Sequence, residues 1–372
     1  MLRLLAVILL GVLCLDPAAR TVVMQPIARR MAITIDDLPT ASVLGDDVAS
    51  AERTTTALVD ALVRNHVPAI GFINERKLQP RGAVDPQRVA LLQQWIDAGL
   101  ELGNHTFSHP DLHNTPLADF EREVLEGERV TKPLLAAKGK PLRFFRHPFL
   151  HTGRTLEIKT AFEAFLQRHG YRVAPVTIDN YDYLFAAAYD RTGAKGDGQG
   201  QQRVADAYIS YMDAVVGFYE EQSVKIVGRE VAQTLLLHAS ALNAATFDRL
   251  AASLRARGYQ FIKLSAALED PAYKHRDEYV GAAGMTWLHR WALTDGIKGS
   301  TFAGEPVVPA WIEAAAIAGL SRRSLQALLG DALRLRTSIS DAEPILDTGR
   351  ANGASEQVRT TTIQRAADGP SQ

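Results

Sequence analysis

The sequence is short of cysteine, because Cys14 is the only one among 372 residues. The chain therefore cannot form an internal disulfide, and a metal bound away from this residue must be held by histidines and carboxylates. A charge excess is also missing, since 41 lysines and arginines oppose 42 aspartates and glutamates. Without a basic field, nucleic acid is not an expected partner. The apolar run Leu4–Leu15 is shorter than the roughly 20 residues that cross a bilayer, so no transmembrane span is expected.

The N-terminus has the features of a signal peptide. Arg3 precedes the apolar run, and Ala18 and Ala19 after it offer a small-residue cleavage site. We expect residues 1–19 to be removed and the protein to be exported, to the periplasm or the cell exterior. A misplaced start codon and an apolar terminus without a targeting role are the alternatives. The bulky Leu13 disfavours a lipid anchor on Cys14.

Hydrophobic residues make up 47% and charged residues 22% of the sequence, as in ordinary globular proteins. Over residues 30–268, short β-rich runs alternate with runs of helical periodicity. The predicted strands are Ala32–Ile35, Ala69–Ile73, Leu100–Asn104, Arg143–Arg146, Arg172–Ile178, Thr234–His238 and Gln260–Leu264. The predicted helices are Ala51–Asn65, Pro86–Ala98, Leu117–Ala137, Thr155–His169, 202–222 and Ala244–Gly258. This pattern favours a distorted, incomplete (β/α) barrel of about seven parallel strands over an open doubly wound sheet.

The alternation stops after residue 268. We expect residues 269–339 to form a helical C-terminal extension packed on the barrel, with one helix at Ser321–Arg336, and residues 340–372 to be a disordered tail. Trp287 and Trp291 lie four residues apart on a predicted helix, where they either pack against the barrel or form a sugar-stacking platform. Inside the barrel region, the Gly-rich stretch Gly193–Gln201 is predicted to be a mobile loop.

Chemically active side chains follow two of the first strands. Asp36 and Asp37 come at the end of the first strand, and neighbouring strand residues point to opposite sides, so one could bind a metal while the other handles protons. His105 and His109 would share one face of a helical turn and, with a carboxylate, make a metal site with open positions for water and substrate. Alone, the aspartates are also typical of a capping pair, and the histidine spacing also arises by chance.

Three later strands also end in polar residues. Arg146 ends the fourth, Asp179 and Asp182 follow the fifth, and His238 ends the sixth. Singly, Arg146 could be an edge arginine and His238 a core histidine. The carboxyl ends of parallel strands share one face of a barrel, however, and (β/α) barrels build their active sites on that face. The shared placement therefore predicts one catalytic rim, made of Asp36, Asp37, His105, Arg146, Asp182 and His238.

Five short motifs in this region resemble those of the polysaccharide deacetylase family, which is carbohydrate esterase family 4 or the NodB-homology domain. The family's motifs are Thr-Phe-Asp-Asp-Gly, His-Ser/Thr-x-x-His, Arg-x-Pro-Tyr/Phe, Asp-x-x-Asp-Trp and Leu-x-His. They are matched in order by Thr34–Leu38, His105–His109, Arg146–Phe149, Asp179–Tyr183 and Leu236–His238. The resemblance implies the (β/α) barrel of that family over residues 30–268.

The resemblance also implies a metal-dependent hydrolase. One divalent ion, Zn2+ by default with Co2+, Mn2+ or Ni2+ as alternatives, would be bound by Asp37, His105 and His109. The substrate would be an acetylated glycan, such as a chitin, peptidoglycan or other cell-surface fragment, with an N-acetyl group preferred to an O-acetyl group. The bond cut would then be a carbon–nitrogen bond outside a peptide.

Roles in proton transfer follow from the same resemblance. Asp36 would be the general base, held by Arg146, and His238 the general acid, tuned by Asp182. The Phe149 amide would help to bind the oxyanion. Tyr183 and Leu236 are expected against the substrate. Such a base–acid pair implies a bell-shaped dependence of the rate on pH.

The sequence departs from the family at three positions. Leu38 replaces the glycine of the first motif, Tyr183 replaces the tryptophan of the fourth, and Ala239 stands where many members have aspartate. These changes keep the metal and proton-transfer groups, but Leu38 and Tyr183 are expected to reshape the pocket walls. A metal-dependent amidohydrolase acting on a non-sugar amide is therefore an alternative. A non-catalytic glycan-binding barrel is a second alternative, and the oligomeric state is left open.

Overall fold

The computed structural model describes residues 29–45 and 47–318. The predicted signal peptide, the helix at Ser321–Arg336 and the tail 340–372 lie outside these residues.

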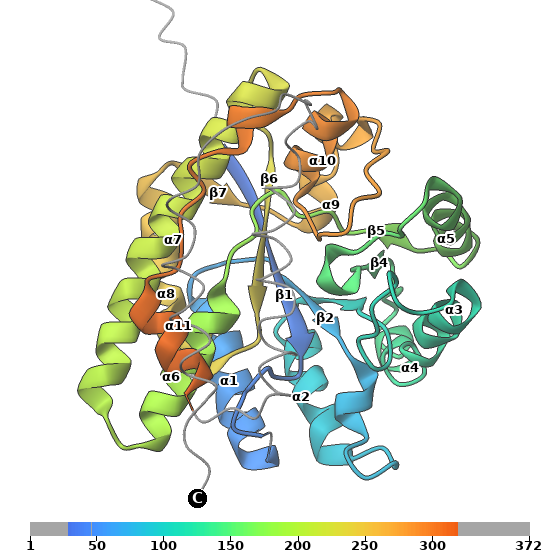
Figure 1. Cartoon of the computed structure of the whole chain (residues 1–372). Helices are drawn as coiled ribbons and strands as arrows, with labels where there is room; N and C mark the ends of the chain where they lie inside the picture. Colours follow the sequence, from blue (N-terminus) through green and yellow to red (C-terminus); the bar gives the residue numbers. More distant parts are fainter. Residues whose placement is uncertain (1–28, 46, 319–372) are drawn as a thin grey trace, which may run out of the picture.

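Seven strands form one parallel sheet that curls into a barrel (Figure 1). They are β1 (Arg29–Leu38), β2 (Ile70–Ile73), β3 (Glu101–Asn104), β4 (Phe144–Phe145), β5 (Arg172–Val173), β6 (Gln233–His238) and β7 (Tyr259–Phe261). Their order is β5-β4-β3-β2-β1-β6, with β7 paired to β1. The chain after β5 returns at Ile178, which bridges Leu235 of β6, so the two edges of the sheet meet at a single isolated bridge. The predicted distorted, incomplete (β/α) barrel is confirmed.

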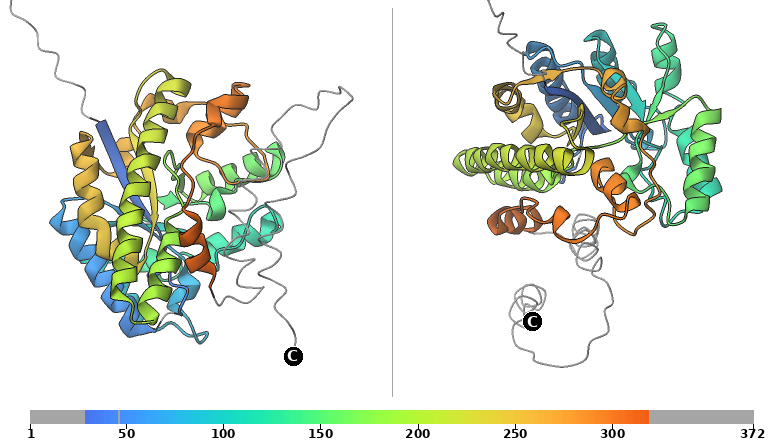
Figure 2. Two further views of the ribbon diagram at one scale, coloured as in Figure 1. Left: turned by 60° about the vertical axis from the view of Figure 1, so that its left-hand side comes forward. Right: turned by 90° about the horizontal axis from the view of Figure 1, so that it is seen from above.

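The helices lie around the outside of the sheet (Figure 2). They are α1 (Val48–Arg64), α2 (Pro86–Asp97), α3 (Leu117–Glu126), α4 (Thr131–Ala136), α5 (Leu156–Arg168), α6 (Asp182–Ala194), α7 (Gly198–Val227), α8 (Ala241–Ala256) and α9 (Leu264–Ala267). Short 3-10 turns occur at η1 (Glu75–Leu78), η2 (Pro148–Leu150), η3 (Pro271–Lys274) and η4 (Gly299–Phe302). The strands are buried on both faces. Ile33, Ile35, Leu235 and Leu237, which share one face, are each at most 1% exposed, and so are Ala32 and Thr34 on the other face.

The Gly-rich stretch Gly193–Gln201 is helical over most of its length, so its prediction as a mobile loop is wrong. Only residues 195–197 separate α6 from α7. The side chain of Asp197 caps α7 by accepting a hydrogen bond from the Gly200 N–H. A Cβ on Gly200 would lie 2.4 Å from the Thr192 side chain, so this glycine serves close packing between the two helices.

The predicted helix Leu117–Ala137 is broken into α3 and α4 near Gly127. A Cβ on Gly127 would lie 2.5 Å from the backbone carbon of Thr106, so the break lets the chain pack against that loop. The Glu75 carboxylate then accepts hydrogen bonds from the N–H groups of Val130 and Thr131, where α4 begins. These tertiary contacts outweigh the helical periodicity of the segment.

The described part of the C-terminal extension contains α10 (Trp287–Thr294) and α11 (Ala310–Ile317). Trp287 is 7% and Trp291 1% exposed, so both pack into the core and neither forms a sugar-stacking platform. The Trp287 N–H donates to the Val176 carbonyl, which ties α10 to the barrel. No helix within residues 29–45 and 47–318 is long and apolar enough to cross a membrane.

Candidate active site

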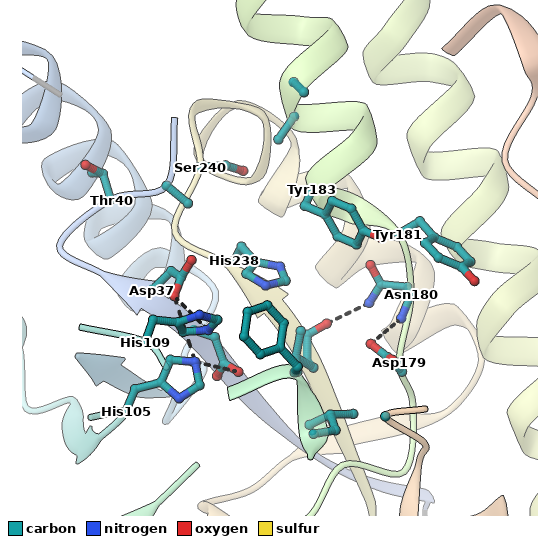
Figure 3. A pocket seen from close by; sticks show the side chains of 18 of the residues that line it. Asp37, Thr40, His105, His109, Asp179, Asn180, Tyr181, Tyr183, His238 and Ser240 are labelled. Carbon is teal, nitrogen blue, oxygen red and sulfur yellow. Dashed lines mark hydrogen bonds and ion pairs between the residues drawn. The ribbon is translucent and has the colours of Figure 1, made fainter. Parts of the chain in front are cut away.

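A pocket of about 450 Å³ opens at the carboxyl ends of the strands (Figure 3). Most of the predicted site residues line it, namely Asp36, Asp37, His105, His109, Phe149, Tyr183, Leu236 and His238. The two others, Arg146 and Asp182, are fully buried beside it. Residues from five separate segments of the chain therefore meet at one place.

One carboxylate and two imidazoles converge on one side of this pocket (Figure 3). Asp37 Oδ1 is 3.8 Å from His105 Nε2 and 3.8 Å from His109 Nε2. The His105 Nδ1 lies 2.8 Å from the Arg146 carbonyl, which can only accept, so Nδ1 carries the proton and the Nε2 lone pair faces Asp37. Asp37 Oδ1 is buried without a hydrogen-bond partner among the described residues.

These three groups fit a divalent ion. Two ligands about 2.1 Å from an ion are at most about 4.2 Å apart, and the Asp37–histidine separations of 3.8 Å fall inside that limit. An ion would also satisfy the orphaned Asp37 oxygen. Burial would raise the pKa of Asp37, but Lys77 and the nearby histidines outweigh it and hold that pKa below its ordinary value.

A strained loop presents the two histidines, and the predicted helical turn at residues 105–109 is wrong. Thr106 has φ of 70° and His109 has φ of 62°, values that side-chain-bearing residues rarely adopt. Glu123 of α3 holds the loop, because its carboxylate accepts from both the N–H and the hydroxyl of Ser108, at 2.7 and 2.9 Å. Asn74 donates to the His105 carbonyl from the other side.

Backbone strain is concentrated around the pocket. The six non-glycine residues with positive φ in the described chain include Asp37, Thr106, His109, Phe149 and Leu150. Such conformations cost of the order of 1–3 kcal/mol each and collect at functional sites. Their clustering at the pocket is evidence for a functional site, and this evidence is independent of which side chains are present.

Asp36 and Asp37 both face the pocket, so the expectation that they point to opposite sides is wrong. The register of β1 against β2 shifts between Ile35 and Leu38, and Asp37 adopts φ of 70°. This irregularity turns Asp37 toward the same imidazole that Asp36 approaches, and Asp36 Oδ2 is 3.8 Å from His105 Nε2.

Asp36 is a buried carboxylate beside the guanidinium of Arg146. It is 2% exposed, and Arg146 Nε lies 3.8 Å from its Oδ2, too far for a hydrogen bond. Arg146 instead donates to the Thr34 hydroxyl at 2.8 Å and lies over the Phe72 ring. Burial raises the pKa of Asp36 to about 6, against the opposing effect of Arg146. A carboxylate of this kind is poised to accept a proton near neutral pH.

His238 faces the same pocket from β6 (Figure 3). Its Nδ1 is 2.7 Å from Asp182 Oδ1, and its backbone N–H donates to Asp182 Oδ2 at 2.8 Å. Burial alone would lower the pKa of His238, but Asp182 outweighs it and raises the pKa to about 9. Asp182 was expected at the end of a strand, but it lies in the first turn of α6.

Sequence reasoning missed several residues that support the site. Asn243 donates to Asp182 Oδ2 and to the His238 carbonyl, and the Tyr208 hydroxyl donates to Asn243. Lys77 of η1 contacts Asp37 and lines the pocket. Asn243 follows the capping residue Ser240 by three positions, but nothing in the sequence links Asn243, Tyr208 or Lys77 to the strand ends.

Of the two departures from the family motifs that were expected to reshape the pocket walls, only Tyr183 lies in the pocket. Tyr183 lines the pocket with its ring 6.0 Å from that of His238. Leu38 does not line it and is fully buried in the core. Its side chain fills the space above Gly71, where an added Cβ would lie 2.4 Å from Leu38 Cδ2. The replacement of glycine by Leu38 therefore changes the core beneath the site.

Asp111, His113 and His151 form a second group of metal-ligating residue types near Phe149. His151 Nδ1 is 2.7 Å from Asp111 Oδ1, and the two imidazoles stack in parallel with centroids 3.9 Å apart and planes at 7°. Parallel stacked rings cannot both direct an in-plane lone pair at one ion, whereas the rings of His105 and His109 cross at 75°. The second group is therefore a hydrogen-bonded stack in this arrangement.

In a comparison with known protein families, residues 24–174 match the family model described as Polysaccharide deacetylase. By this match, residues 24–174 are similar to the polysaccharide deacetylase family. The matched segment contains Asp36, Asp37, His105, His109 and Arg146, and the resemblance predicted from the motifs is confirmed. Asp182 and His238 follow the matched segment. The fold brings His238 to the same pocket, with Asp182 buried behind it.

A named relative matches a shorter stretch. The chain is 33% identical over 95 residues to a chitooligosaccharide deacetylase of Sinorhizobium fredii (strain NBRC 101917 / NGR234), a stretch that is 26% of this chain and 40% of that protein. The chain therefore spans less than half the length of this relative.

Two solved structures of enzymes also match part of the chain. A family 4 carbohydrate esterase from Streptomyces lividans in complex with acetate is 20% identical, with a TM-score of 0.38 over 62% of this chain and 90% of that one. The peptidoglycan deacetylase PdaC from Bacillus subtilis is 19% identical, with a TM-score of 0.40 over 66% of this chain and 92% of that one.

Proposed function

We propose that the protein is a metal-dependent hydrolase that removes acetyl groups from a carbohydrate. The observation that carries this proposal is the meeting, in one pocket, of an Asp–His–His group, a buried aspartate and an Asp–His pair. The family match over residues 24–174 supports the reaction class.

Asp37, His105 and His109 would hold one divalent ion. Their one oxygen and two nitrogen donors suit Zn2+ first, and Co2+, Mn2+ or Ni2+ as alternatives. Bound there, such an ion supplies Lewis-acid activation of water and of the acyl carbonyl.

The remaining steps belong to groups of this chain, side chains and one backbone N–H. Asp36 accepts a proton from the attacking water, and Arg146 balances the charge of Asp36 from below at 3.8 Å. The water oxygen bonds to the acyl carbon, and the Phe149 N–H would help to bind the resulting oxyanion. His238 has its Nδ1 engaged by Asp182, which leaves Nε2 to protonate the leaving amine as the carbon–nitrogen bond breaks. Acetate and the free amine are the products.

An acetylated glycan is the proposed substrate, with N-acetyl preferred. The matched relative is named for chitooligosaccharides, and Tyr181 and Tyr183 provide aromatic faces on the pocket wall. Apolar residues on the same wall, including Phe149, Leu150 and Leu236, favour the second candidate, a metal-dependent amidohydrolase acting on a non-sugar amide. Export to the periplasm or the cell exterior stays a prediction.

Two substitutions test the proposed roles. His105→Ala removes a metal donor and is expected to abolish both ion binding and turnover. Asp36→Asn keeps the donor set and is expected to retain the ion while turnover falls by roughly 10²-fold or more. Ion content is measured by elemental mass spectrometry, and activity by mass spectrometry of products from acetylated chitin, peptidoglycan and xylan fragments, with linear and cyclic amides alongside.

The outcomes separate the candidate functions. Near-normal turnover by Asp36→Asn would contradict the assignment of the base. Turnover only on the amides would favour the amidohydrolase. A wild-type protein that binds an ion and a glycan but hydrolyses nothing would favour a non-catalytic glycan-binding barrel.

A further inference from the structure

Lys77 is fixed beside the candidate metal site by three oxygen atoms. Its ammonium donates to the carbonyls of Asp37 and Thr40, at 2.9 and 3.1 Å. It also lies 3.6 Å from Asp37 Oδ2. An ammonium has three donors and no acceptor, so two are spent on the carbonyls and one remains. At 3.6 Å the carboxylate oxygen is an ion-pair neighbour of Lys77 and not a hydrogen-bond partner. The two contacts with backbone carbonyls hold the Lys77 ammonium in place independently of the orientation of the Asp37 carboxylate.

The two oxygens of Asp37 therefore lie in different environments. Oδ1 is buried, has no hydrogen-bond partner among the described residues, and is 3.8 Å from each imidazole Nε2. Oδ2 pairs with the Lys77 ammonium instead. The positive φ of Asp37 and the carbonyl contacts of Lys77 belong to one short segment, residues 37–40 at the end of β1. The backbone and the side chain of Asp37 are therefore oriented together.

We propose that Lys77 is a positioning residue that occupies Oδ2 of Asp37 and leaves only Oδ1 for the divalent ion. This inference rests on the proposed function, because it assumes that Asp37, His105 and His109 hold an ion. A carboxylate that binds through one oxygen fills one position on the ion and keeps others open, as a catalytic site requires. Lys77 thus lowers the affinity for the ion and preserves the space in which water and substrate react.

The proposal predicts that affinity and rate change in opposite directions. In Lys77→Met, Oδ2 is released to the ion and a repelling charge is lost, so we expect the ion to bind roughly tenfold more tightly. The rate constant kcat is expected to fall roughly 10- to 100-fold, because a position needed by the reactants is filled. Cobalt-substituted Lys77→Met should absorb visible light more weakly than the wild type, as a rise in Co2+ coordination number produces.

The experiment titrates Zn2+ into the metal-free full-length protein by calorimetry and records kcat and the Co2+ spectrum. Arg76→Met is the matched control, because Arg76 is exposed on the same turn and its substitution removes one positive charge without touching Asp37. Lys77→Arg keeps the charge and is expected to keep the wild-type affinity. If Lys77→Met does not fold by circular dichroism, Lys77→Gln serves in its place, since its amide can still donate to one carbonyl.

Tighter binding with slower turnover supports the proposal. A parallel loss of affinity and rate, or an unchanged affinity, overturns it, because Lys77 would then only stabilise the segment or do nothing. Failure of the proposed function looks different. In that case the wild-type protein binds no ion, or His105→Ala binds it as well as the wild type.

Discussion

The proposed acid, His238, takes its character from residues that do not touch the pocket. Asp182 is fully buried, yet it contacts both the ring and the backbone N–H of His238. Asn243 donates to the same carboxylate, and Tyr208 holds Asn243. A chain of buried hydrogen bonds therefore fixes which ring nitrogen faces the substrate side. Each link is satisfied, as buried polar groups must be if they are not to cost stability.

Replacing Asp182 should change both the protonation of His238 and the proposed hydrolytic activity. In Asp182→Asn the charge that raises the pKa of His238 to about 9 is lost, while the burial that lowers it stays. We therefore expect the pKa of His238 to fall below its ordinary value, and the rate to drop by about 10²-fold or more at neutral pH. NMR titration of the imidazole in the metal-free protein measures the first effect, and steady-state kinetics the second. A His238 pKa that stayed near 9 would contradict this assignment of its cause.

At the scale of elements, the strands and the residues at their ends could be predicted from the sequence. Alternating apolar and helical runs predict a parallel sheet. Asp37 and His238 lie in the last residues of β1 and β6, and His105 directly follows β3, so one rim was predictable. The local conformations were not. Asp37 and His109 adopt positive φ because of contacts with other elements, such as Lys77 and Glu123, which no spacing reveals. Strand β1 carries its irregularity at the position where alternation would have turned Asp37 away.

The contact between Leu38 and Gly71 is a packing match between neighbouring strands. Because an added Cβ would lie 2.4 Å from Leu38 Cδ2 and 3.2 Å from the Trp95 ring, Gly71→Ala is expected to destabilise the protein by about 1–3 kcal/mol. In a Leu38→Ala background the same change should cost clearly less, since the clashing methyl groups are gone. Urea unfolding of the four proteins gives the coupling free energy. Strictly additive effects would show that the two residues do not meet as described.

At the scale of the whole molecule, the C-terminal extension is joined to both the barrel and the pocket. Gly284 packs so closely that a Cβ on it would lie 1.9 Å from the Phe149 carbonyl oxygen, and Gly284 also lines the pocket. At the start of the extension, Asp270 is 2% exposed and accepts hydrogen bonds from the N–H groups of Ala232 and Ala272. The Arg229 guanidinium binds both oxygens of the same carboxylate. Asp270 thus connects the end of α7, the segment before β6 and η3.

This connection should make stability depend on pH in a defined window. Burial alone would raise the pKa of Asp270, but Arg229 and the backbone N–H groups outweigh it and lower the pKa from 3.8 to about 2. A carboxyl group whose pKa is lower in the folded state stabilises it above the unfolded pKa, and that contribution is lost as the pH falls toward the folded pKa. Urea unfolding of wild type and Asp270→Asn should therefore differ most above about pH 5, with a pH-dependent part of up to about 2 kcal/mol that disappears toward about pH 2. A difference that stayed constant across this range would mean that the charge on Asp270 does not hold the extension to the barrel.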